Sequence, residues 1–252
     1  MKRSIMICEG GTDAIVLQYY MRKAFLWNEV EDKARQKSIA FMEGQKSRLL
    51  EKEGNELTIM PAGGISLVPE AIDNTLMRIK KSSVDLLEAY NDIVIITDRD
   101  DIDSETELLD MISQKAQEYG VQTDGGGAIA SGEWLSCSIK TDLGIDHSFR
   151  ILAFLLPIDG IGAMETFLLN AIAKESTYDA TLIHEGNSFV DSVDPERRYL
   201  SKRRYITKAK FDVFFSIRTP LEQFNERQRL LLSCPWEEYT AINQGLILLA
   251  DI

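Results

Sequence analysis

The stretch from Asp92 to Thr97, DIVIIT, constrains the fold of this chain more than any other part of the sequence. Its residues after Asp92 are apolar and β-branched up to Thr97, without the apolar–polar alternation of a strand that has one solvated face. Continuous runs of this kind are typical of parallel strands that are covered by helices on both faces. The stretch therefore predicts a buried strand inside an α/β sheet. It leads directly into the acids Asp98, Asp100 and Asp101.

Other parts of the first two thirds of the chain repeat this pattern of strand followed by helix. Short apolar runs predict further strands at residues 5–8, 57–61 and 149–156. Amphipathic stretches predict helices at residues 12–25, 67–90, 104–119 and 162–174. Thr12 and Ser104 have the hydroxyl side chains that favour helix N-caps. Because strands that alternate with helices pair in parallel, we predict a mostly parallel central sheet flanked by helices.

Two regions do not follow this alternation. Residues 28–53 are highly charged, and their widely spaced apolar residues predict either a peripheral helix or an excursion with a loop around Gly44. The part after about Tyr178 has no strong strand signal and is typical of helices, at residues 205–217, 220–232 and 236–249. The sequence thus predicts an α/β domain over residues 1–175 and a helical C-terminal extension, packed on it, over residues 176–252.

Cysteine and histidine content limits the chemistry that this chain can carry. Its three cysteines have no CxxC spacing and only two histidines are present, which disfavours a disulfide framework, a zinc site and a histidine-dependent nucleophile. We expect a reducing, cytoplasmic location. Because Glu9 interrupts the first apolar stretch, no signal peptide is expected, and no apolar run is long enough to span a membrane.

The charge of the chain is strongly negative overall but unevenly distributed. A net charge of −12 disfavours a protein that coats nucleic acid, because phosphate binding needs cations. One run between residues 197 and 210 is the exception, with seven cations and no acid. These cations are Arg197, Arg198, Lys202, Arg203, Arg204, Lys208 and Lys210. A local positive field of this kind attracts a polyanion, although the same run also fits a solvated helix face or loop.

Acids follow the predicted strands at the point where each strand ends. Glu9 follows the first strand, Asp98 and Asp100 follow the strand at 92–97, and Glu165 lies in the helix after the strand at 149–156. Ligands of open α/β sheets bind at the carboxyl ends of the strands. Carboxylates that meet there repel one another, and a bound Mg²⁺ or Mn²⁺ relieves this repulsion. Isolated acids are nevertheless common at strand ends, where they favour turns and helix N-termini.

The segments CEGGTD, residues 8–13, and IVIITDRDD, residues 93–101, resemble the two motifs of the Toprim superfamily. This superfamily includes topoisomerases, bacterial primases, ribosomal-RNA maturases and overcoming-lysogenization-defect nucleases. The resemblance implies a Rossmannoid fold with about four central parallel strands and a metal-dependent phosphodiester chemistry. It implies that Glu9 is a metal ligand or general acid/base, that Asp98 and Asp100 bind the metal, that Asp13 is structural and that Gly10 permits the tight turn.

A weaker resemblance extends toward the C-terminus. Residues 156–172 and 205–217 resemble parts of small uncharacterised bacterial Toprim-like proteins, in which an acid after the fourth strand and a downstream lysine complete the site. This resemblance implies that Glu165 is a metal ligand and that Lys208 or Lys210 is catalytic. The chain has no segment like a topoisomerase tyrosine domain, a zinc-binding module or a helicase domain, which disfavours strand passage and primer synthesis.

Three functions remain open from the sequence. The first is Mg²⁺- or Mn²⁺-dependent hydrolysis of phosphodiester bonds in DNA or RNA, with a nucleic-acid-binding surface at Arg197, Arg198, Lys202, Arg203 and Arg204. The second is a non-catalytic protein that binds nucleic acid or a partner, which the negative net charge favours. The third is a small-molecule phosphatase.

Some motifs have competing interpretations. Asp98 and Asp100 partly match a haloacid-dehalogenase pair, but the threonine that such a pair requires two residues later is Ile102. The turn at residues 63–66 binds phosphate in one interpretation and only links a strand to a helix in the other. The three tryptophans are expected in the core or in an interface more than in base stacking.

Overall fold

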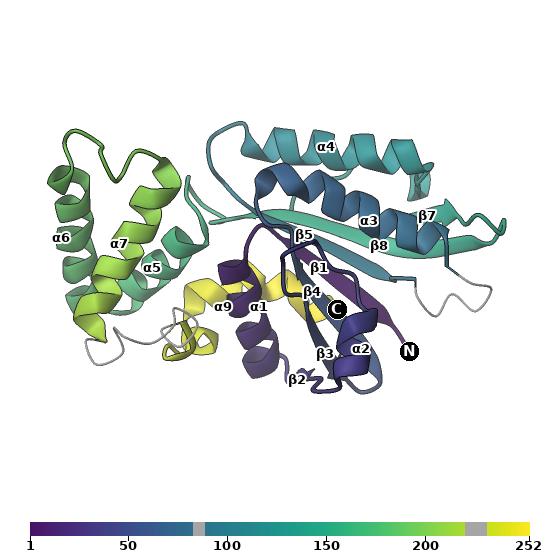
Figure 1. Ribbon diagram of the computed structural model, residues 1–252, viewed down its shortest axis with the longest axis horizontal. Coiled ribbons are helices and arrows are strands. Elements are labelled where there is room, and N and C mark those ends of the chain that lie inside the picture. The colour runs from purple at the N-terminus through teal and green to yellow at the C-terminus, as the bar shows by residue number, and fades with distance from the viewer. Residues whose placement is uncertain (83–88, 220–230) are drawn as a thin grey trace. The chain divides into compact units, whose positions relative to one another are not determined.

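The computed structural model describes residues 1–82, 89–219 and 231–252 (Figure 1). The chain forms two compact units. The first unit consists of Met1–Leu155 together with Ala250–Ile252, and the second consists of Leu156–Leu249. The division falls where the last long strand ends, so the helix expected at residues 162–174 belongs to the second unit.

A mixed eight-stranded sheet forms the centre of the first unit, with the strand order β2-β3-β4-β1-β5-β8-β7-β6. The strands are β1 (Arg3–Cys8), β2 (Asn28–Glu29), β3 (Arg48–Lys52), β4 (Asn55–Pro61), β5 (Asp92–Asp98), β6 (Gln122–Thr123), β7 (Leu135–Lys140) and β8 (Asp146–Leu156). All four predicted strands are therefore present. β1 pairs in parallel with β4 and with β5, whereas β2–β3, β3–β4, β6–β7 and β7–β8 are antiparallel pairs.

The prediction of a mostly parallel sheet is correct for its centre and wrong for its sides. Lys52 pairs with Asn55, so only Glu53 and Gly54 connect β3 to β4. Both turn residues have positive φ, +51° and +80°, as a type I′ hairpin turn requires. Because a two-residue turn can join only antiparallel strands, the charged stretch at 28–53 ends as half of a hairpin. It contains the short helix α2 (Lys33–Ser38), a turn at Gly44 and the strand β3.

Helices cover both faces of the central strands (Figure 1). They are α1 (Gly11–Ala24), α3 (Val68–Lys80) and α4 (Ser104–Tyr119). On one face, Ile5 and Ile7 of β1 pack in a buried cluster with Ile72 of α3 and Ile112 of α4. Met6 points to the opposite face, where α1 packs against β3 and β4. Every residue of β1 is consequently buried, which explains the continuous apolar run at residues 5–8.

The second unit is helical. Its helices are α5 (Met164–Glu175), α6 (Thr177–Val193), α7 (Arg203–Arg218) and α9 (Thr240–Leu246), with a short 3₁₀ turn at Trp236–Glu238. α5 packs against α6, α7 and α9. The rings of Phe211, Phe215 and Trp236 form its aromatic core, and Trp236 is completely buried, as expected for a core tryptophan.

The helical prediction for the last part of the chain is confirmed for residues 205–217, which lie in α7. The stretch at 236–249 forms a 3₁₀ turn, α9 and a further 3₁₀ turn in place of one helix. The helix predicted at 220–232 lies almost entirely outside the described residues. In the part of the chain that the structure describes, no helix is long and apolar enough to cross a membrane.

Candidate functional site

The structure brings Glu9 and Asp98 together at the carboxyl end of the central strands. β1 and β5 are adjacent and parallel, and Cys8 pairs with Ile96. Glu9 follows the end of β1 and Asp98 ends β5, so both residues reach the same edge of the sheet. The backbone N–H of Asp98 donates a hydrogen bond of 2.8 Å to Oε1 of Glu9. The Glu9 side chain is therefore directed across the strand ends toward Asp98.

Two glycines after β4 fix the backbone of Glu9. The N–H groups of Gly63 and Gly64 each donate a hydrogen bond of 2.8 Å to the carbonyl oxygen of Glu9. Both glycines have positive φ, +102° and +134°, which side-chain-bearing residues rarely adopt. Because these two amides bind Glu9, the turn at 63–66 acts as a support for this residue. The N–H groups of Gly63 and Gly64 are therefore not available to a phosphate.

Asp13 fixes the next peptide of the same turn. Its Oδ2 accepts a hydrogen bond of 2.8 Å from the N–H of Gly10, which occupies the N-cap position of α1. Thr12, the expected N-cap, instead lies inside the first turn of the helix. The carboxylate at the third helical position reaches back to the cap, which stabilises the helix start. This contact agrees with a structural role for Asp13 and Gly10.

Negative charge concentrates around the end of β1. The Cys8 side chain is completely buried, and this burial raises the pKa of its thiol well above the usual value. The charges of Asp13, Glu9 and Asp98 raise that pKa further, whereas Arg48 acts in the opposite direction. Cys8 is therefore a protonated packing residue and not a thiolate nucleophile.

Arg48 is a cation near this site that the sequence analysis did not identify. It begins β3, and its Nε donates a hydrogen bond of 2.6 Å to Oε1 of Gln18 in α1. Burial lowers the pKa of Arg48, while the nearby Cys8 and Glu29 act against this shift. The residue stands in the charged stretch at 28–53, where a single arginine gives no signal of its place in the fold.

The acids that follow Asp98 have different surroundings. Asp100 is exposed. Asp101 caps α4, because its Oδ1 accepts hydrogen bonds from the N–H groups of Asp103 and Ser104, at 3.0 and 2.9 Å. Ser104 is thus the first residue of α4, and the expected cap function belongs to the side chain of Asp101.

The donor set at the strand ends fits a hydrated divalent cation. Within residues 1–82, 89–219 and 231–252, no three His, Cys, Asp or Glu side chains are arranged as a metal-binding group. Glu9 and Asp98 nevertheless lie at two adjacent strand ends, where the Glu9 carboxylate contacts the backbone of Asp98. Mg²⁺ keeps several waters and is commonly bound through one or two carboxylates together with substrate phosphates. A cation held here would therefore need waters or substrate oxygens besides Glu9 and Asp98.

The remaining predicted site residues belong to the second unit. Glu165 is 4% exposed in the first turn of α5. Lys210 of α7 forms an ion pair of 2.8 Å with Asp191 of α6, whereas Lys208 is exposed. The convergence of these residues with Glu9 remains a prediction. The five cations predicted to bind nucleic acid lie in the connection between α6 and α7 and in the first turn of α7.

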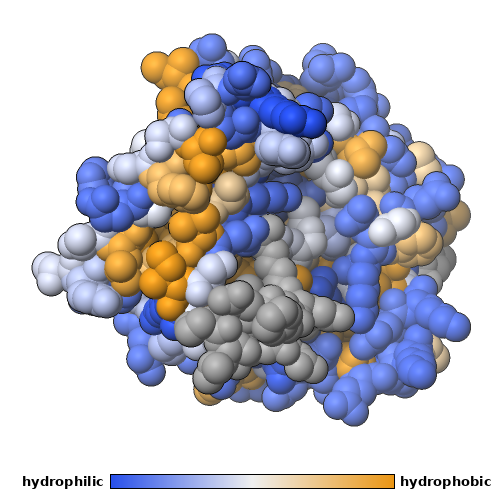
Figure 2. Space-filling model, turned by 60° about the vertical axis from the view of Figure 1, so that its left-hand side comes forward, coloured by the Kyte–Doolittle hydropathy of each residue, from blue (hydrophilic) through white to orange (hydrophobic). Residues whose placement is uncertain are grey.

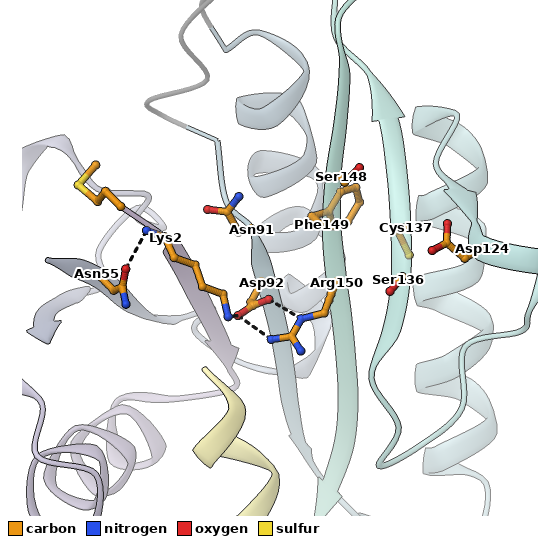
Figure 3. Close-up of a pocket in the computed structure, with 11 residues that line it drawn as sticks. Lys2, Asn55, Asn91, Asp92, Asp124, Ser136, Cys137, Ser148, Phe149 and Arg150 are labelled. Carbon is orange, nitrogen blue, oxygen red and sulfur yellow. Dashed lines mark hydrogen bonds and ion pairs between the residues drawn. The ribbon is translucent and has the colours of Figure 1, made fainter. Parts of the chain in front are cut away.

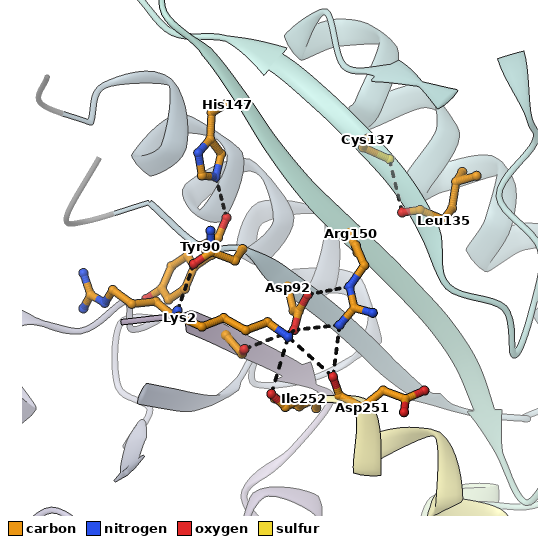
Figure 4. Close-up of polar contacts among 12 residues, drawn as sticks. Lys2, Tyr90, Asp92, Leu135, Cys137, His147, Arg150, Asp251 and Ile252 are labelled. Carbon is orange, nitrogen blue, oxygen red and sulfur yellow. Dashed lines mark hydrogen bonds and ion pairs between the residues drawn. The ribbon is translucent and has the colours of Figure 1, made fainter. Parts of the chain in front are cut away.

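A second polar feature lies at the amino ends of β1 and β5, away from the acidic site (Figure 3). The side chain of Asp92, 1% exposed, forms ion pairs with Lys2 and with Arg150, the latter at 2.9 Å. Arg150 and Lys2 also donate to the backbone carbonyl of Asp251 (Figure 4). Lys2, Asp92 and Arg150 line part of an open cavity of about 610 Å³. Because the buried charge has two cationic partners, the cluster is suited to a structural role.

Gly63→Ala is expected to lower the free energy of unfolding by roughly 1–3 kcal/mol, because the φ of +102° is strained for alanine. A Cβ there would also lie 3.0 Å from Nε2 of Gln45 and 3.3 Å from Cδ1 of Leu67. Urea denaturation measures this loss. The control is Gly44→Ala, at φ +72° with no atom within 4 Å of the new Cβ. If both variants lost the same free energy of unfolding, the close packing around Gly63 would not contribute to the loss in Gly63→Ala.

The fold and the acidic strand ends define a mixed α/β protein with a carboxylate site at the end of its parallel centre. The chain belongs to the family described as "Protein of unknown function (DUF3226)", whose model matches residues 3–228. No curated protein was found to match the chain.

Solved structures add information on the fold alone. The hypothetical protein PH0156 from Pyrococcus horikoshii OT3 is similar over 99% of this chain and 100% of its own, with a TM-score of 0.52 and 15% identity. The fosfomycin resistance protein FosX from Listeria monocytogenes covers 62% of this chain and 90% of its own, at 13% identity. Its TM-score of 0.18 is too low to support an argument.

Proposed function

We propose that this protein is a Toprim-like, Mg²⁺- or Mn²⁺-dependent phosphodiester hydrolase that acts on nucleic acid. The observation that carries the proposal is the contact between Glu9 and Asp98 at the carboxyl end of two adjacent parallel strands. In the Toprim motifs that the sequence resembles, the corresponding glutamate and aspartate belong to the same site.

The rigidity of Glu9 supports a catalytic role. Its backbone carbonyl is bound by Gly63 and Gly64, and one oxygen of its side chain is bound by the N–H of Asp98. Catalysis by positioning requires groups that are held in place before substrate arrives. A divalent cation, when bound at Glu9 and Asp98, supplies charge stabilisation at the phosphoryl oxygens. Glu9 then either holds the cation or moves a proton at its carboxylate.

Other residues complete the proposal. Asp100 and Glu165 are further proposed metal ligands, and Lys208 or Lys210 is proposed to stabilise charge on the scissile phosphate. Of the two lysines, Lys208 fits this role better, because the side chain of Lys210 pairs with Asp191. The cations from Arg197 to Arg204 are proposed to bind the phosphate backbone of DNA or RNA, since the acidic site alone repels a polyanion.

A binding protein without catalytic activity is the second candidate. It is favoured by the observation that, among the described residues, the acids do not form a group of three that is ready to hold a metal. Incubation of the protein with labelled DNA and RNA, with Mg²⁺, with Mn²⁺ and with EDTA, distinguishes the two candidates. Cleavage that requires the cation supports the hydrolase, and binding without cleavage under every condition supports the alternative.

Millimolar Mg²⁺ or Mn²⁺ is expected to raise the melting temperature of the protein, because a ligand at about 100 times its Kd stabilises the folded state by about 2.7 kcal/mol. Asp98→Asn is expected to remove most of this rise. The same substitution should raise the melting temperature of the metal-free protein, because it relieves repulsion between adjacent carboxylates. Thermal melts test both effects, with the exposed Asp103→Asn as the control. A wild-type melting temperature that neither cation changes would argue strongly against the metal site.

A further inference from the structure

The connection between α6 and α7 presents an unusual combination of side chains. Residues 197–205 contain five cations, two tyrosines and no acid, and all but Leu200 are exposed. The cations are Arg197, Arg198, Lys202, Arg203 and Arg204, and the tyrosines are Tyr199 and Tyr205. We call this segment the basic–aromatic segment. Figure 2 shows one face of the molecule, on which hydrophobic and hydrophilic side chains are interspersed.

Both tyrosine rings are accessible and lie next to cations. Tyr199 is 72% exposed and Tyr205 is 39% exposed, so neither ring is used mainly for packing in the core. The guanidinium of Arg198 lies 5.4 Å from the ring centroid of Tyr199, and that of Arg204 lies 5.1 Å from the ring centroid of Tyr205. Such cation–π contacts are favourable even at exposed sites. They hold positive charge close to each ring.

The electrostatic field at Tyr205 is positive. A hydrogen bond from Arg204, together with the charges of Arg204, Lys202 and Lys208, lowers the pKa of the Tyr205 hydroxyl. This direction agrees with the geometry, in which Arg204 donates a hydrogen bond of 3.3 Å to the Tyr205 hydroxyl and lies beside its ring. A polyanion that approaches Tyr205 therefore meets an attractive field, in contrast to the net charge of the whole chain.

The segment has a defined shape although it is exposed. The side chain of Asp194 accepts hydrogen bonds from the N–H groups of Arg198, Tyr199 and Leu200, at 3.0, 2.7 and 2.8 Å. These bonds lower the pKa of Asp194, so its carboxylate stays ionised and continues to organise the turn. A turn that is ordered before binding loses less conformational entropy when a ligand arrives.

We propose that the basic–aromatic segment binds single-stranded nucleic acid, with unpaired bases stacked on Tyr199 and Tyr205 and with phosphates bound by the surrounding cations. This inference rests on the proposed function and specifies its substrate as a single strand. Exposed aromatic rings beside cations match the way proteins bind single strands without sequence preference. In a duplex the bases already stack on one another, so duplex binding gains from the cations but not from the rings.

Binding of fluorescently labelled oligonucleotides, followed by anisotropy in EDTA, tests the proposal without interference from cleavage. The probes are a single strand of about 15 nucleotides, which is within the usual range of site sizes, and a duplex of the same length. We expect the full-length protein to bind the single strand more tightly. Tyr199→Ala and Tyr205→Ala are each expected to weaken single-strand binding by about 5- to 160-fold, the range given by loss of one stacked base. Duplex binding should change little.

Three control variants separate stacking from other effects. Tyr199→Phe keeps an aromatic ring and should retain most of the single-strand affinity. Tyr178→Ala removes a tyrosine that is 74% exposed at the start of α6, outside the segment, and should have no effect. Replacement of Arg198 and Arg204 by Gln should weaken binding to both probes and reduce the salt dependence, because each lost phosphate contact releases one fewer counterion.

The possible results distinguish this inference from the proposed function. Equal affinity for single strand and duplex, unchanged by both Tyr→Ala variants, would overturn base stacking and leave electrostatic binding. Preference for an acidic peptide, with neither nucleic-acid probe bound at low salt, would overturn the inference in favour of a protein partner. Cation-dependent cleavage without stacking would contradict the inference alone, whereas stacking without cleavage would contradict the hydrolase alone.

Discussion

Glu9→Gln is expected to reduce cation-dependent cleavage of DNA or RNA by about 10²- to 10⁴-fold, the range typical for the loss of a group that transfers protons in the reaction. Glutamine keeps a side-chain oxygen that can accept the 2.8 Å hydrogen bond from the N–H of Asp98. The local structure is therefore retained while the negative charge and the capacity to take up a proton are lost. Single-turnover cleavage rates, measured with the protein in saturating excess over a labelled substrate, give the effect directly.

The control for this variant is Glu107→Gln. Glu107 is an exposed acid in the first turn of α4, and its replacement removes one negative charge from the same unit. Its cleavage rate should equal that of the wild type. If Glu9→Gln cleaved as fast as Glu107→Gln, with an unchanged melting temperature, the catalytic role of Glu9 would have to be abandoned.

Arg150→Met is expected to lower the free energy of unfolding by about 3 kcal/mol, at the lower end of the range for breaking a buried ion pair. The carboxylate of Asp92 is almost completely buried and would keep only Lys2 as a charged partner. The variant also removes the contact between Arg150 and the ring of Trp134, where the guanidinium lies 4.3 Å from the ring centroid. Urea denaturation gives the change in free energy.

Two comparisons establish the cause of this loss. Adding Asp92→Asn to Arg150→Met should recover part of the stability, because the uncompensated buried charge is then absent. Lys140→Met breaks an exposed pair with Asp146, separated by 3.8 Å, and should change the free energy by less than about 1 kcal/mol. A loss in Arg150→Met no larger than in Lys140→Met would show that the Asp92 pair contributes little.

The sequence predicted those elements whose signal is local. β1 and β5 are buried on both faces, so the unbroken apolar run within each was sufficient to predict a strand. β7 was not predicted. Its buried residues Cys137 and Ile139 alternate with more exposed neighbours, but this alternation extends over only a few residues and gives a weak signal. β3 was hidden because Arg48, Glu51 and Lys52 made it resemble a charged surface segment.

The candidate site was predictable only in part, because its contacts join residues that are distant in sequence. Glu9 and Asp98 were identified because each follows an apolar run, but their contact depends on the pairing of β1 with β5. The support that Gly63 and Gly64 give to Glu9 was ambiguous, since two glycines after a strand also suit a simple turn. The cluster around Asp92 left no signal, because Lys2 and Arg150 are distant from it in sequence.

The return of Ala250–Ile252 to the first unit has a consequence for the rates of folding and unfolding. Lys2 and Arg150 donate to the carbonyl of Asp251 across 249 and 101 positions of the chain. Contacts that close such long loops carry a large entropic cost and are expected to form late, after the sheet has assembled. Interactions absent from the folding transition state act mainly on the unfolding rate. We therefore expect the last residues to slow the opening of the first unit without accelerating its formation.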